Sequence, residues 1–180
     1  MIGGEGDDIV HVDQDDTWYS GGVGTDTIKY VGTGDFEYSL DQGHFEVVFS
    51  GAGNDALWGG DADEEFHGGA GNDELHGGAG NNTFYGDSGN DYIVSGVGDD
   101  TIRIEGSVFG HDSVDDFTAG AGSKDKFILD SDVFADFADV MSKAEDWGGS
   151  TTYITLDDDN SITLYGVQKS DLHVDDFQFV

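Results

Sequence analysis

Residues 50–103 read SGAGNDALW GGDADEEFH GGAGNDELH GGAGNNTFY GDSGNDYIV SGVGDDTIR, six consecutive units of nine with no residue gained or lost between them. The shared pattern is G-G-x-G-x-D-x-U-x, in which U is a large apolar residue. The eighth position is apolar in every unit, and the sixth position carries an acid or an amide: Asp55, Glu64, Asp73, Asn82, Asp91 and Asp100. A period this strict excludes an ordinary globular domain and indicates a repeat architecture.

Each nonapeptide divides into a turn and a short strand. The glycine-rich half adopts left-handed and bulged conformations at little steric cost. The x-U-x half is a three-residue strand with one side chain pointing inward. Two units then make one full coil of a parallel spiral, with the strands of successive coils about 4.8 Å apart. Every second turn therefore stacks directly on its predecessor.

This stacking predicts two columns of side chains, one on each edge of the spiral. Asp55, Asp73 and Asp91 belong to one column, and Glu64, Asn82 and Asp100 belong to the other. Two carboxylates at this spacing repel each other by roughly 1–3 kcal/mol near a protein surface, so a cation is needed between them. Carboxylate oxygens and the backbone carbonyls of a glycine turn form an all-oxygen cage, which suits calcium.

The units resemble the repeats of RTX (repeats-in-toxin, or hemolysin-type) calcium-binding proteins. The resemblance implies an all-β fold, a right-handed parallel β-roll with several calcium ions bound between turns stacked on the same edge. The ligands that it implies are the sixth-position side chains together with carbonyl groups of the glycine half, here those of Gly51, Gly53, Gly69, Gly71 and Gly89.

Repeats also occur on both sides of the central array. Residues 3–11 and 21–29 fit the pattern, and 12–20 keeps its phase without the glycines. Asp8 and Asp26 are thus two repeats apart, which predicts a further calcium site. After three added residues, 107–115 resumes the pattern, and its Asp112 is expected to join the column of Asp55, Asp73 and Asp91.

Residues 30–49 break the period. Apolar and polar residues alternate on both sides of Asp41-Gln42-Gly43, which is typical of a β-hairpin. The segment is either a hairpin-like insertion laid against the roll or a larger pair of coils that continues the spiral.

Residues 116–180 contain no repeats. We expect a strand over 125–129, a helix that begins after Ser131 or Asp132 and carries Val133 and Phe134 on its apolar face, and a hairpin formed by TTYITL and SITLY. The expected organisation is a roll over 1–115 and a C-terminal segment, 116–180, that covers the open apolar end of the roll.

This C-terminal segment resembles the flank of type I-secreted RTX proteins such as the serralysin-type proteases. In those proteins a motif D-K-I-x-L recurs, matched here by DKFIL at 125–129. The resemblance implies an uncleaved secretion signal near the C-terminus, where the chain ends Asp176-Phe177-Gln178-Phe179-Val180. The type I secretion machinery is then the expected partner.

Charge and composition restrict which partners and which cellular location the chain can have. The 39 acidic and 6 basic residues give a net charge of −33, which argues against nucleic acid as a partner. No apolar run suits a membrane span, and the N-terminus lacks the layout of a signal peptide. Because the chain opens almost directly inside a repeat, we expect it to be the C-terminal part of a larger protein that is secreted to the cell surface or beyond.

The sequence also contains features that suggest weaker calcium binding in one column or a catalytic function. The second column contains Glu64 and the uncharged Asn82, so weaker or missing sites are expected there. The run Gly86-Asp87-Ser88-Gly89 matches a serine-protease nucleophile sequence, but the repeat phase accounts for it, and no H-E-x-x-H helix is present. We expect no catalytic activity from this chain.

The ninth position of each repeat faces outward. It forms two expected rows, Trp58, His76 and Val94 on one sheet and His67, Tyr85 and Arg103 on the other. These rows either pack against the irregular segments or form a face for polysaccharide, as the RTX modules of alginate epimerases do. The main hypothesis is a calcium-triggered folding and type I secretion module; the alternative is a carbohydrate-binding accessory module.

Overall fold

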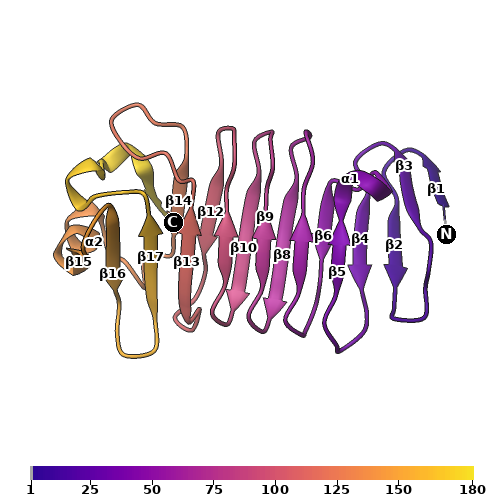
Figure 1. The fold of residues 1–180 in the computed structure, drawn as a ribbon, viewed down its shortest axis with the longest axis horizontal. Coiled ribbons are helices and arrows are strands. Elements are labelled where there is room, and N and C mark those ends of the chain that lie inside the picture. The colour runs from indigo at the N-terminus through magenta and orange to yellow at the C-terminus, as the bar shows by residue number, and fades with distance from the viewer. Residues whose placement is uncertain (1) are drawn as a thin grey trace.

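A computed structural model describes residues 2–180 and shows a β-roll made of two parallel-stranded layers (Figure 1). Each layer is an eight-stranded sheet, and from β4 to β14 the chain passes from one sheet to the other at every turn. The first sheet contains, in spatial order, β18 (Phe177–Phe179), β14 (Lys126–Leu129), β12 (Thr101–Ile104), β10 (Thr83–Ser88), β8 (Glu65–Ala70), β6 (Val47–Phe49), β4 (Thr27–Tyr30) and β2 (Ile9–Val12).

The second sheet faces the first across the core. Its order is β15 (Ala144–Asp146), β16 (Thr151–Thr155), β17 (Ser161–Tyr165), β13 (His111–Asp115), β11 (Tyr92–Val94), β9 (Glu74–His76), β7 (Ala56–Trp58) and β5 (Glu37–Ser39). A separate parallel pair, β1 (Ile2–Glu5) and β3 (Ser20–Val23), lies at the N-terminal end. The expected all-β roll is confirmed.

The register of the strands confirms that two nonapeptides make one coil. Phe84 pairs with Phe66 on one side and Ile102 on the other, and in the second sheet Ile93 pairs with Leu75. All of these eighth-position side chains are fully buried. Each contributes roughly 1.5–3 kcal/mol through the apolar surface it removes from water, so the core is a continuous stack between the sheets.

The glycines of the turns allow successive coils to approach closely. Gly69 has a φ of +93°, and a Cβ there would lie 2.1 Å from the Gly51 carbonyl oxygen. Gly71 has a φ of +126°, and its Cβ would lie 1.6 Å from the Gly53 oxygen. The pattern requires glycine at these positions because both the backbone conformation and the close approach exclude a side chain.

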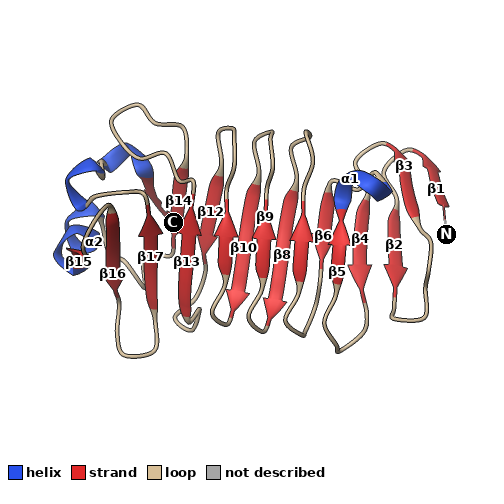
Figure 2. Cartoon of the chain, viewed as in Figure 1, coloured by secondary structure: helices blue, strands red, loops and turns tan. Residues whose placement is uncertain are grey.

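Residues 30–49 form one larger coil of the roll, so the expectation of a hairpin-like insertion is wrong and the alternative of a continued spiral is correct. β5 pairs in parallel with β7 in the second sheet, whereas β6 pairs in parallel with β4 and β8 in the first. The short helix α1 (Leu40–Gly43) replaces the glycine turn between them (Figure 2). The two alternating runs therefore lie on opposite sheets and do not pair with each other.

The C-terminal residues extend both sheets. β14 and β18 add to the first sheet in parallel, and β17 pairs in parallel with β13 in the second. The expected hairpin is present, since β16 and β17 are antiparallel. The sheets thus run through the expected boundary at 115/116, and α2, β15 and β16 lie at the end of the roll (Figure 2).

The C-terminal helix is shorter than its apolar pattern indicated. α2 spans Phe137–Lys143, and Asp136, rather than Ser131 or Asp132, caps it by accepting a hydrogen bond from the Asp139 N–H at 2.9 Å. Val133 and Phe134 lie before the helix, where their N–H groups donate to the Asp130 carbonyl oxygen. Phe134 is fully buried, so its spacing in the sequence reflects packing onto the end of the core and not helical structure.

Two further 3-10 turns, η1 (Lys169–Asp171) and η2 (Val174–Asp176), lead into β18. No helix among residues 2–180 has the length and apolar character needed to cross a membrane.

Candidate metal centre

The sixth-position residues on one edge form an unbroken ladder. The Asp55 N–H donates to Asp73 Oδ1 (2.8 Å), the Asp73 N–H to Asp91 Oδ1 (2.9 Å), and the Asp91 N–H to Asp112 Oδ1 (3.1 Å). At the N-terminal end of this first column, Asp55 Oδ1 accepts from the Phe36 N–H (2.7 Å). The structure thus brings together all four residues that the sequence assigned to this edge, because each pair of repeats returns the chain to the same place, after 18 residues between Asp55, Asp73 and Asp91 and after 21 between Asp91 and Asp112.

The second oxygen of these carboxylates has no partner. The Oδ2 atoms of Asp55, Asp73 and Asp91 are buried without a hydrogen bond. A Cβ on Gly68 would lie 2.4 Å from Asp73 Oδ2, and one on Gly86 would lie 2.4 Å from Asp91 Oδ2. The orphaned oxygens of Asp73 and Asp91 therefore each lie against a first-position glycine, in a cradle that any side chain there would fill, whereas Ser50 holds the first position beside Asp55. Buried, unpaired carboxylate oxygens beside a glycine turn fit a calcium ion.

Burial makes these carboxylates costly to ionise in the absence of a cation. Loss of solvation raises the pKa of Asp73 to about 6, that of Asp91 to about 7 and that of Asp112 to about 8. The backbone N–H bonds lower these pKa values in part, while the neighbouring column carboxylates raise them. A bound cation reverses this effect by favouring the charged form.

The other edge carries a longer column than the sequence indicated. Its members precede the strands of the first sheet: Asp8, Asp26, Glu46, Glu64, Asn82, Asp100 and Asp125. The expected pairing of Asp8 with Asp26 is present, since the Asp8 N–H donates to Asp26 Oδ1 at 2.8 Å. The Oδ2 atoms of Asp8, Asp26 and Asp100 are also buried without a partner.

Glu46 and Asp125 are the column members that sequence reasoning missed. Glu46 accepts the Asp26 N–H (2.7 Å), and Asp125 accepts the N–H groups of Asp100 (2.9 Å) and Thr118 (2.7 Å). Each directly precedes its strand, as the sixth position does in a regular repeat, and this offset was the available signal. Glu46 follows helix α1, and Asp125 follows a turn with Gly120 and Gly122 that lacks the remaining glycine spacing of the repeat, so the nonapeptide pattern did not identify them.

Asn82 gives a structural reason to expect weaker calcium binding in the second column. Its Oδ1 accepts the Glu64 N–H (3.0 Å), as an aspartate would, while its Nδ2 donates to the carbonyl oxygens of Ala79 and Gly80, both at 3.4 Å. The Asn82 amide thus donates hydrogen bonds to carbonyl oxygens of the glycine turn, which is the kind of ligand that the family resemblance assigns to calcium. Weaker binding on this edge stays a prediction.

A third ladder runs along the fifth position of the first edge, which sequence analysis did not identify. The N–H groups of Asn72 and Asn90 donate to the Oδ1 atoms of Asn54 and Asn72, both at 2.8 Å, and the His111 N–H donates to Asn90 Oδ1 (2.8 Å). These exposed side chains accept hydrogen bonds from the N–H groups of the turns. Unlike the column aspartates, they place no unpaired oxygen in the interior. They stabilise the turns around the candidate calcium sites.

Side-chain ligands alone do not complete a metal site. Across residues 2–180, no three His, Cys, Asp or Glu side chains are placed so that they could hold one ion. A calcium ion in either column therefore needs backbone carbonyl oxygens of the glycine turns beside the column carboxylates, as the resemblance implies for Gly51, Gly53, Gly69, Gly71 and Gly89.

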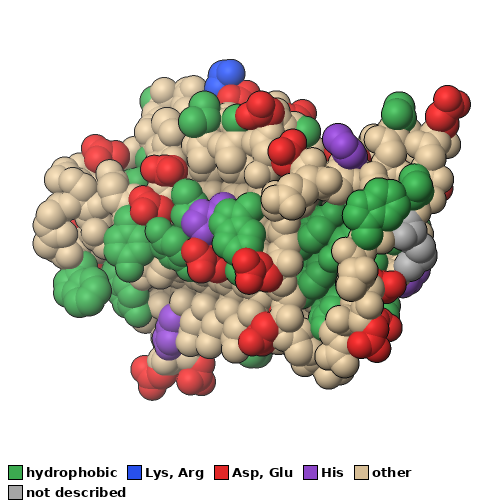
Figure 3. Space-filling model, turned by 45° about the vertical axis from the view of Figure 1, so that its right-hand side comes forward, with side chains coloured by type: hydrophobic (Ala, Val, Ile, Leu, Met, Phe, Trp, Pro, Cys, Tyr) green, Lys and Arg blue, Asp and Glu red, His purple; other side chains and the backbone are tan. Residues whose placement is uncertain are grey.

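The outward rows are stacked ladders. His67 stacks between Phe49 (4.1 Å between ring centroids) and Tyr85 (4.3 Å), and Arg103 lies over Tyr85 at 5.3 Å. In the second sheet Trp58 stacks with His76 at 6.0 Å, and the next residue of that row is Val94. Figure 3 shows His and hydrophobic side chains together among acidic groups on one face of the molecule. The rows are formed as the strand pattern predicts, and their rings face each other along the roll.

The Gly86-Asp87-Ser88-Gly89 run lies in a turn of the roll. Asp87 has a φ of +68°, a left-handed conformation that second-position glycines also adopt, and Ser88 Oγ donates to the Gly69 carbonyl oxygen at 3.3 Å. The repeat phase explains this run, as the sequence indicated.

A stacked spiral with columns of orphaned carboxylates defines the class of calcium-binding β-roll repeats. Residues 43–75 and 67–102 match the RTX calcium-binding nonapeptide repeat, in four copies. This part of the chain is therefore an array of RTX calcium-binding nonapeptide repeats, which confirms the resemblance. No curated protein matches the chain.

Two solved structures match this chain at low sequence identity. A subunit of the mannuronan C5-epimerase of Azotobacter vinelandii, solved in solution, is 23% identical, with a TM-score of 0.49 over 81% of this chain and 78% of that one. The extracellular lipase LipA of Serratia marcescens is 16% identical, with a TM-score of 0.47 over 99% of this chain. The chain spans 38% of that lipase.

Proposed function

We propose that this chain is a calcium-triggered folding module at the C-terminus of a larger exported protein, and that it serves type I secretion. The observation that carries the proposal is the row of buried Oδ2 atoms of Asp55, Asp73 and Asp91 in the first column, each without a hydrogen bond, with those of Asp73 and Asp91 beside a glycine. Calcium would supply positive charge between these oxygens. The column carboxylates and turn carbonyls of the chain would hold it.

The charge balance explains why folding would depend on calcium. The net charge of −33 and the two columns of stacked acids oppose compaction when no cation is present. The apolar core supplies the driving force once that repulsion is offset. Folding and binding are then coupled, with affinities of about 10⁻⁴–10⁻³ M typical of extracellular calcium modules.

Secretion enters the proposal through this coupling. A chain that is unfolded at the low calcium concentration of the cytoplasm can pass through a narrow export channel, and it folds on reaching millimolar calcium outside. The C-terminal residues 116–180 cover the apolar end of the roll, and their last residues are proposed to hold the uncleaved export signal. We assign no catalysis to this module, and we place it outside the cell.

A calcium titration followed by far-UV circular dichroism tests the folding switch. We expect a cooperative gain of β signal near millimolar calcium and none with magnesium, which demands a smaller octahedral site. A chain that is fully folded in chelator and unaffected by calcium would contradict the proposal.

Export is tested separately in cells that express a type I secretion system. A reporter fused to residues 1–180 should appear in the medium, and the same reporter fused to residues 1–115 should stay inside. If both fusions are exported equally, the signal does not lie in the C-terminal segment.

Carbohydrate binding is the second candidate, and the outward aromatic rows are the observation that favours it. Trp58 lines a cavity of about 230 Å³ with Tyr38 and Gln42, which combines a ring with polar groups. The stacking of His67 on Tyr85 works against it, because rings that face each other present only their edges to a sugar. Binding to a glycan array that disappears in Trp58→Ala would support this candidate, and full folding without any glycan binding would exclude it.

A further inference from the structure

The hairpin of β15 and β16 carries an aromatic pair on its outer face. Glu145 lies directly opposite Tyr153 in the antiparallel ladder, so the two side chains share a face. The neighbours of Tyr153 along β16, Thr152 and Ile154, are buried, which directs Tyr153 outward. Trp147 follows at the hairpin turn, and its ring lies 6.2 Å from the Tyr153 ring between centroids, at an angle of 55°. Two tilted aromatic rings thus meet at the surface of the hairpin.

A cavity of about 380 Å³ lies at this pair of rings. Its lining is formed by Glu145, Asp146, Trp147 and Tyr153, with no Lys or Arg among them. The volume is within the range of small-molecule sites, roughly 300–1,000 Å³. The lining therefore combines aromatic surface with negative charge only.

The negative charge of this cavity is not neutralised by the basic residue nearby. The exposed carboxylate of Glu145 forms no hydrogen bond or ion pair with any residue of the described chain, 2–180. Asp146 Oδ1 accepts the Lys169 N–H at 2.7 Å, while the Lys169 ammonium donates to the Ala144 carbonyl oxygen at 2.7 Å. Both carboxylates thus keep their charge available to a ligand.

The ring of Tyr153 is held in place from below. Its hydroxyl oxygen accepts a hydrogen bond from Ser161 Oγ at 2.9 Å, and Ser161 Oγ lies 2.9 Å from His111 Nδ1. Ser161 is 1% exposed, so the hydroxyl end of the tyrosine is anchored to the interior of the second sheet. A ring that is already fixed loses little conformational freedom when a ligand binds.

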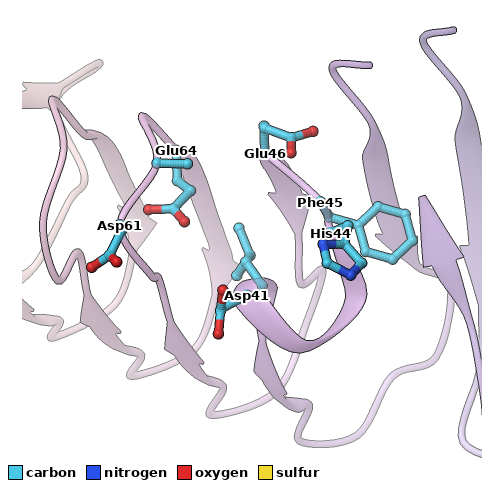
Figure 4. A pocket seen from close by; sticks show the side chains of 8 residues that line it. Asp41, His44, Phe45, Glu46, Asp61 and Glu64 are labelled. Carbon is cyan, nitrogen blue, oxygen red and sulfur yellow. The ribbon is translucent and has the colours of Figure 1, made fainter. Parts of the chain in front are cut away.

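The acidic cavity between α1 and the turn 59–64 lacks this combination (Figure 4). Its volume is about 300 Å³, and Asp41, Glu46 and Asp61 contribute carboxylates to its lining. No Trp or Tyr lines it, and the Phe45 ring beside it is 2% exposed. The two cavities share their acidity, but of the two only the hairpin cavity presents Trp and Tyr rings. This difference supplies a control for charge.

Rings beside unpaired carboxylates favour a cation that needs no hydrogen bonds. The faces of Trp and Tyr attract positive charge that lies within about 6 Å of the ring centroid, and Trp does so most strongly. A primary ammonium is compact and strongly hydrated, so it loses water when it contacts a ring. The methyl groups of a quaternary ammonium pack on ring faces directly, and its charge is attracted both to the rings and to Glu145.

We propose that the cavity of the β15–β16 hairpin binds a quaternary ammonium group. Trp147 and Tyr153 contact its methyl groups, and Glu145 supplies the opposite charge. Free choline and the headgroup of phosphatidylcholine present this same chemistry. None of these three residues belongs to a calcium column, so the site goes beyond the proposed folding and secretion function.

The dissociation constant of choline, measured by ¹H–¹⁵N NMR on the full chain in saturating calcium, tests the site. The amide signals of residues 145–153 should shift on titration. The neutral isostere 3,3-dimethylbutan-1-ol, which has the same shape without the charge, should bind about threefold or more weaker. Trp147→Ala should weaken choline binding by about threefold or more, with an unchanged circular dichroism spectrum, because Trp147 is 74% exposed. Glu145→Gln should weaken it roughly twofold.

Two control variants match these changes. Asp61→Asn removes one charge from the acidic cavity of Figure 4, and Trp58→Ala removes a ring from the outer face of the same sheet. Both should keep the wild-type affinity for choline. An equal loss in Asp61→Asn and Glu145→Gln would show that net charge alone attracts choline, and an equal loss in Trp58→Ala and Trp147→Ala would place binding elsewhere. Either result would overturn the site.

The ligand itself decides the remaining outcomes. Equal affinity for choline and the neutral isostere would overturn the proposal, since the cavity would then recognise apolar shape and not charge. Co-sedimentation with phosphatidylcholine vesicles that is lost in Trp147→Ala would support the site and assign it to a lipid headgroup, whereas binding of choline alone would support it and assign it to a soluble molecule. Binding of neither would overturn it. Because every measurement uses the calcium-loaded chain, these outcomes leave the proposed folding switch untouched.

Discussion

The two oxygens of a column aspartate have different roles, and that difference is the basis of the calcium dependence. In Asp73, Oδ1 accepts a backbone N–H from the neighbouring coil and fixes the stacking, whereas Oδ2 is buried without a partner. The first interaction stabilises the coil in any condition. The second oxygen destabilises it until a cation binds.

At the residue scale, the first prediction concerns pH. The raised pKa of Asp91, about 7, and of Asp112, about 8, means that the folded state binds protons more tightly than the unfolded chain, whose aspartates have ordinary pKa values. Protonation therefore stabilises the calcium-free roll. This added stability is fully present below the pKa that the aspartates have in the unfolded chain, and it is lost as the pH rises through their pKa values in the folded state. Calcium-depleted protein should show more β signal at pH 5 than at pH 8.

The control for this experiment is Asp91→Asn/Asp112→Asn, in which the two groups do not titrate. The variant should show a smaller difference in β signal between pH 5 and pH 8. A wild-type signal that is the same at both pH values would contradict the prediction, as would one that falls on acidification.

A second residue-scale prediction separates backbone strain from close approach. Gly69 and Gly122 have similar positive φ values, +93° and +77°, but only Gly69 faces the backbone of another coil. Alanine costs about 1–2 kcal/mol at either site for the left-handed conformation. Gly69→Ala should in addition push apart two coils, so its calcium midpoint should rise several-fold above that of Gly122→Ala in a circular dichroism titration. Equal midpoints would show that the turns tolerate a side chain.

At the scale of the elements, the turns decide how strongly each edge binds calcium. Asn82 occupies a column position with an amide that donates to its own turn, between two coils that carry acids. An aspartate at position 82 would still accept the hydrogen bond that Asn82 Oδ1 accepts. Its second oxygen would stand where the Asn82 amide now donates. This edge can therefore be strengthened by a single change.

Asn82→Asp should lower the calcium midpoint of folding roughly threefold or more, because an added carboxylate raises the affinity of an oxygen cage. The same variant should be less stable than the wild type in chelator, since the new charge is buried. The matched control is Asn81→Asp, which adds the same charge at an exposed neighbouring position. If both variants shift the midpoint equally, net charge and not the column accounts for the effect.

At the scale of the whole molecule, the C-terminal strand completes the roll. β18 pairs with β14, and Phe177 packs against Phe127 and Phe137, with centroids 5.8 and 5.7 Å away. Asp176 ties this end to the loop before β14: its carboxylate accepts the Gly120 N–H at 2.9 Å and the Ser123 hydroxyl at 2.5 Å. The end that carries the proposed export signal is therefore part of the folded core.

Phe177→Ala should reduce the free energy of unfolding in saturating calcium by about 3 kcal/mol, because it leaves a cavity beside β14. Urea unfolding measures this loss, and Gln178→Ala, an exposed neighbour in the same strand, should change it little. A small effect of Phe177→Ala would show that the roll is stable without its C-terminal strand.

The sequence by itself determined the repeated part of the molecule. Each nonapeptide carries its own turn glycines and its own inward residue, and stacking repeats them in phase. The first column, the regular part of the second column, the buried eighth positions and the outward rows followed from that pattern. Asp55, Asp73 and Asp91 could be assigned to one edge before any coordinates were known because they lie eighteen residues apart, and Asp112 because the pattern resumes after three added residues.

Only the tertiary structure decided the irregular parts. The two runs around α1 alternate as the strands of a hairpin do. Each run nevertheless adds to a different sheet of the roll, because the coils before and after it offer strand edges to pair with. Asp125 belongs to the second column because β14 continues the first sheet. Phe134 lies outside the helix because its side chain covers the end of the core. Local pattern does not specify these choices, which depend on what the adjoining coils leave exposed.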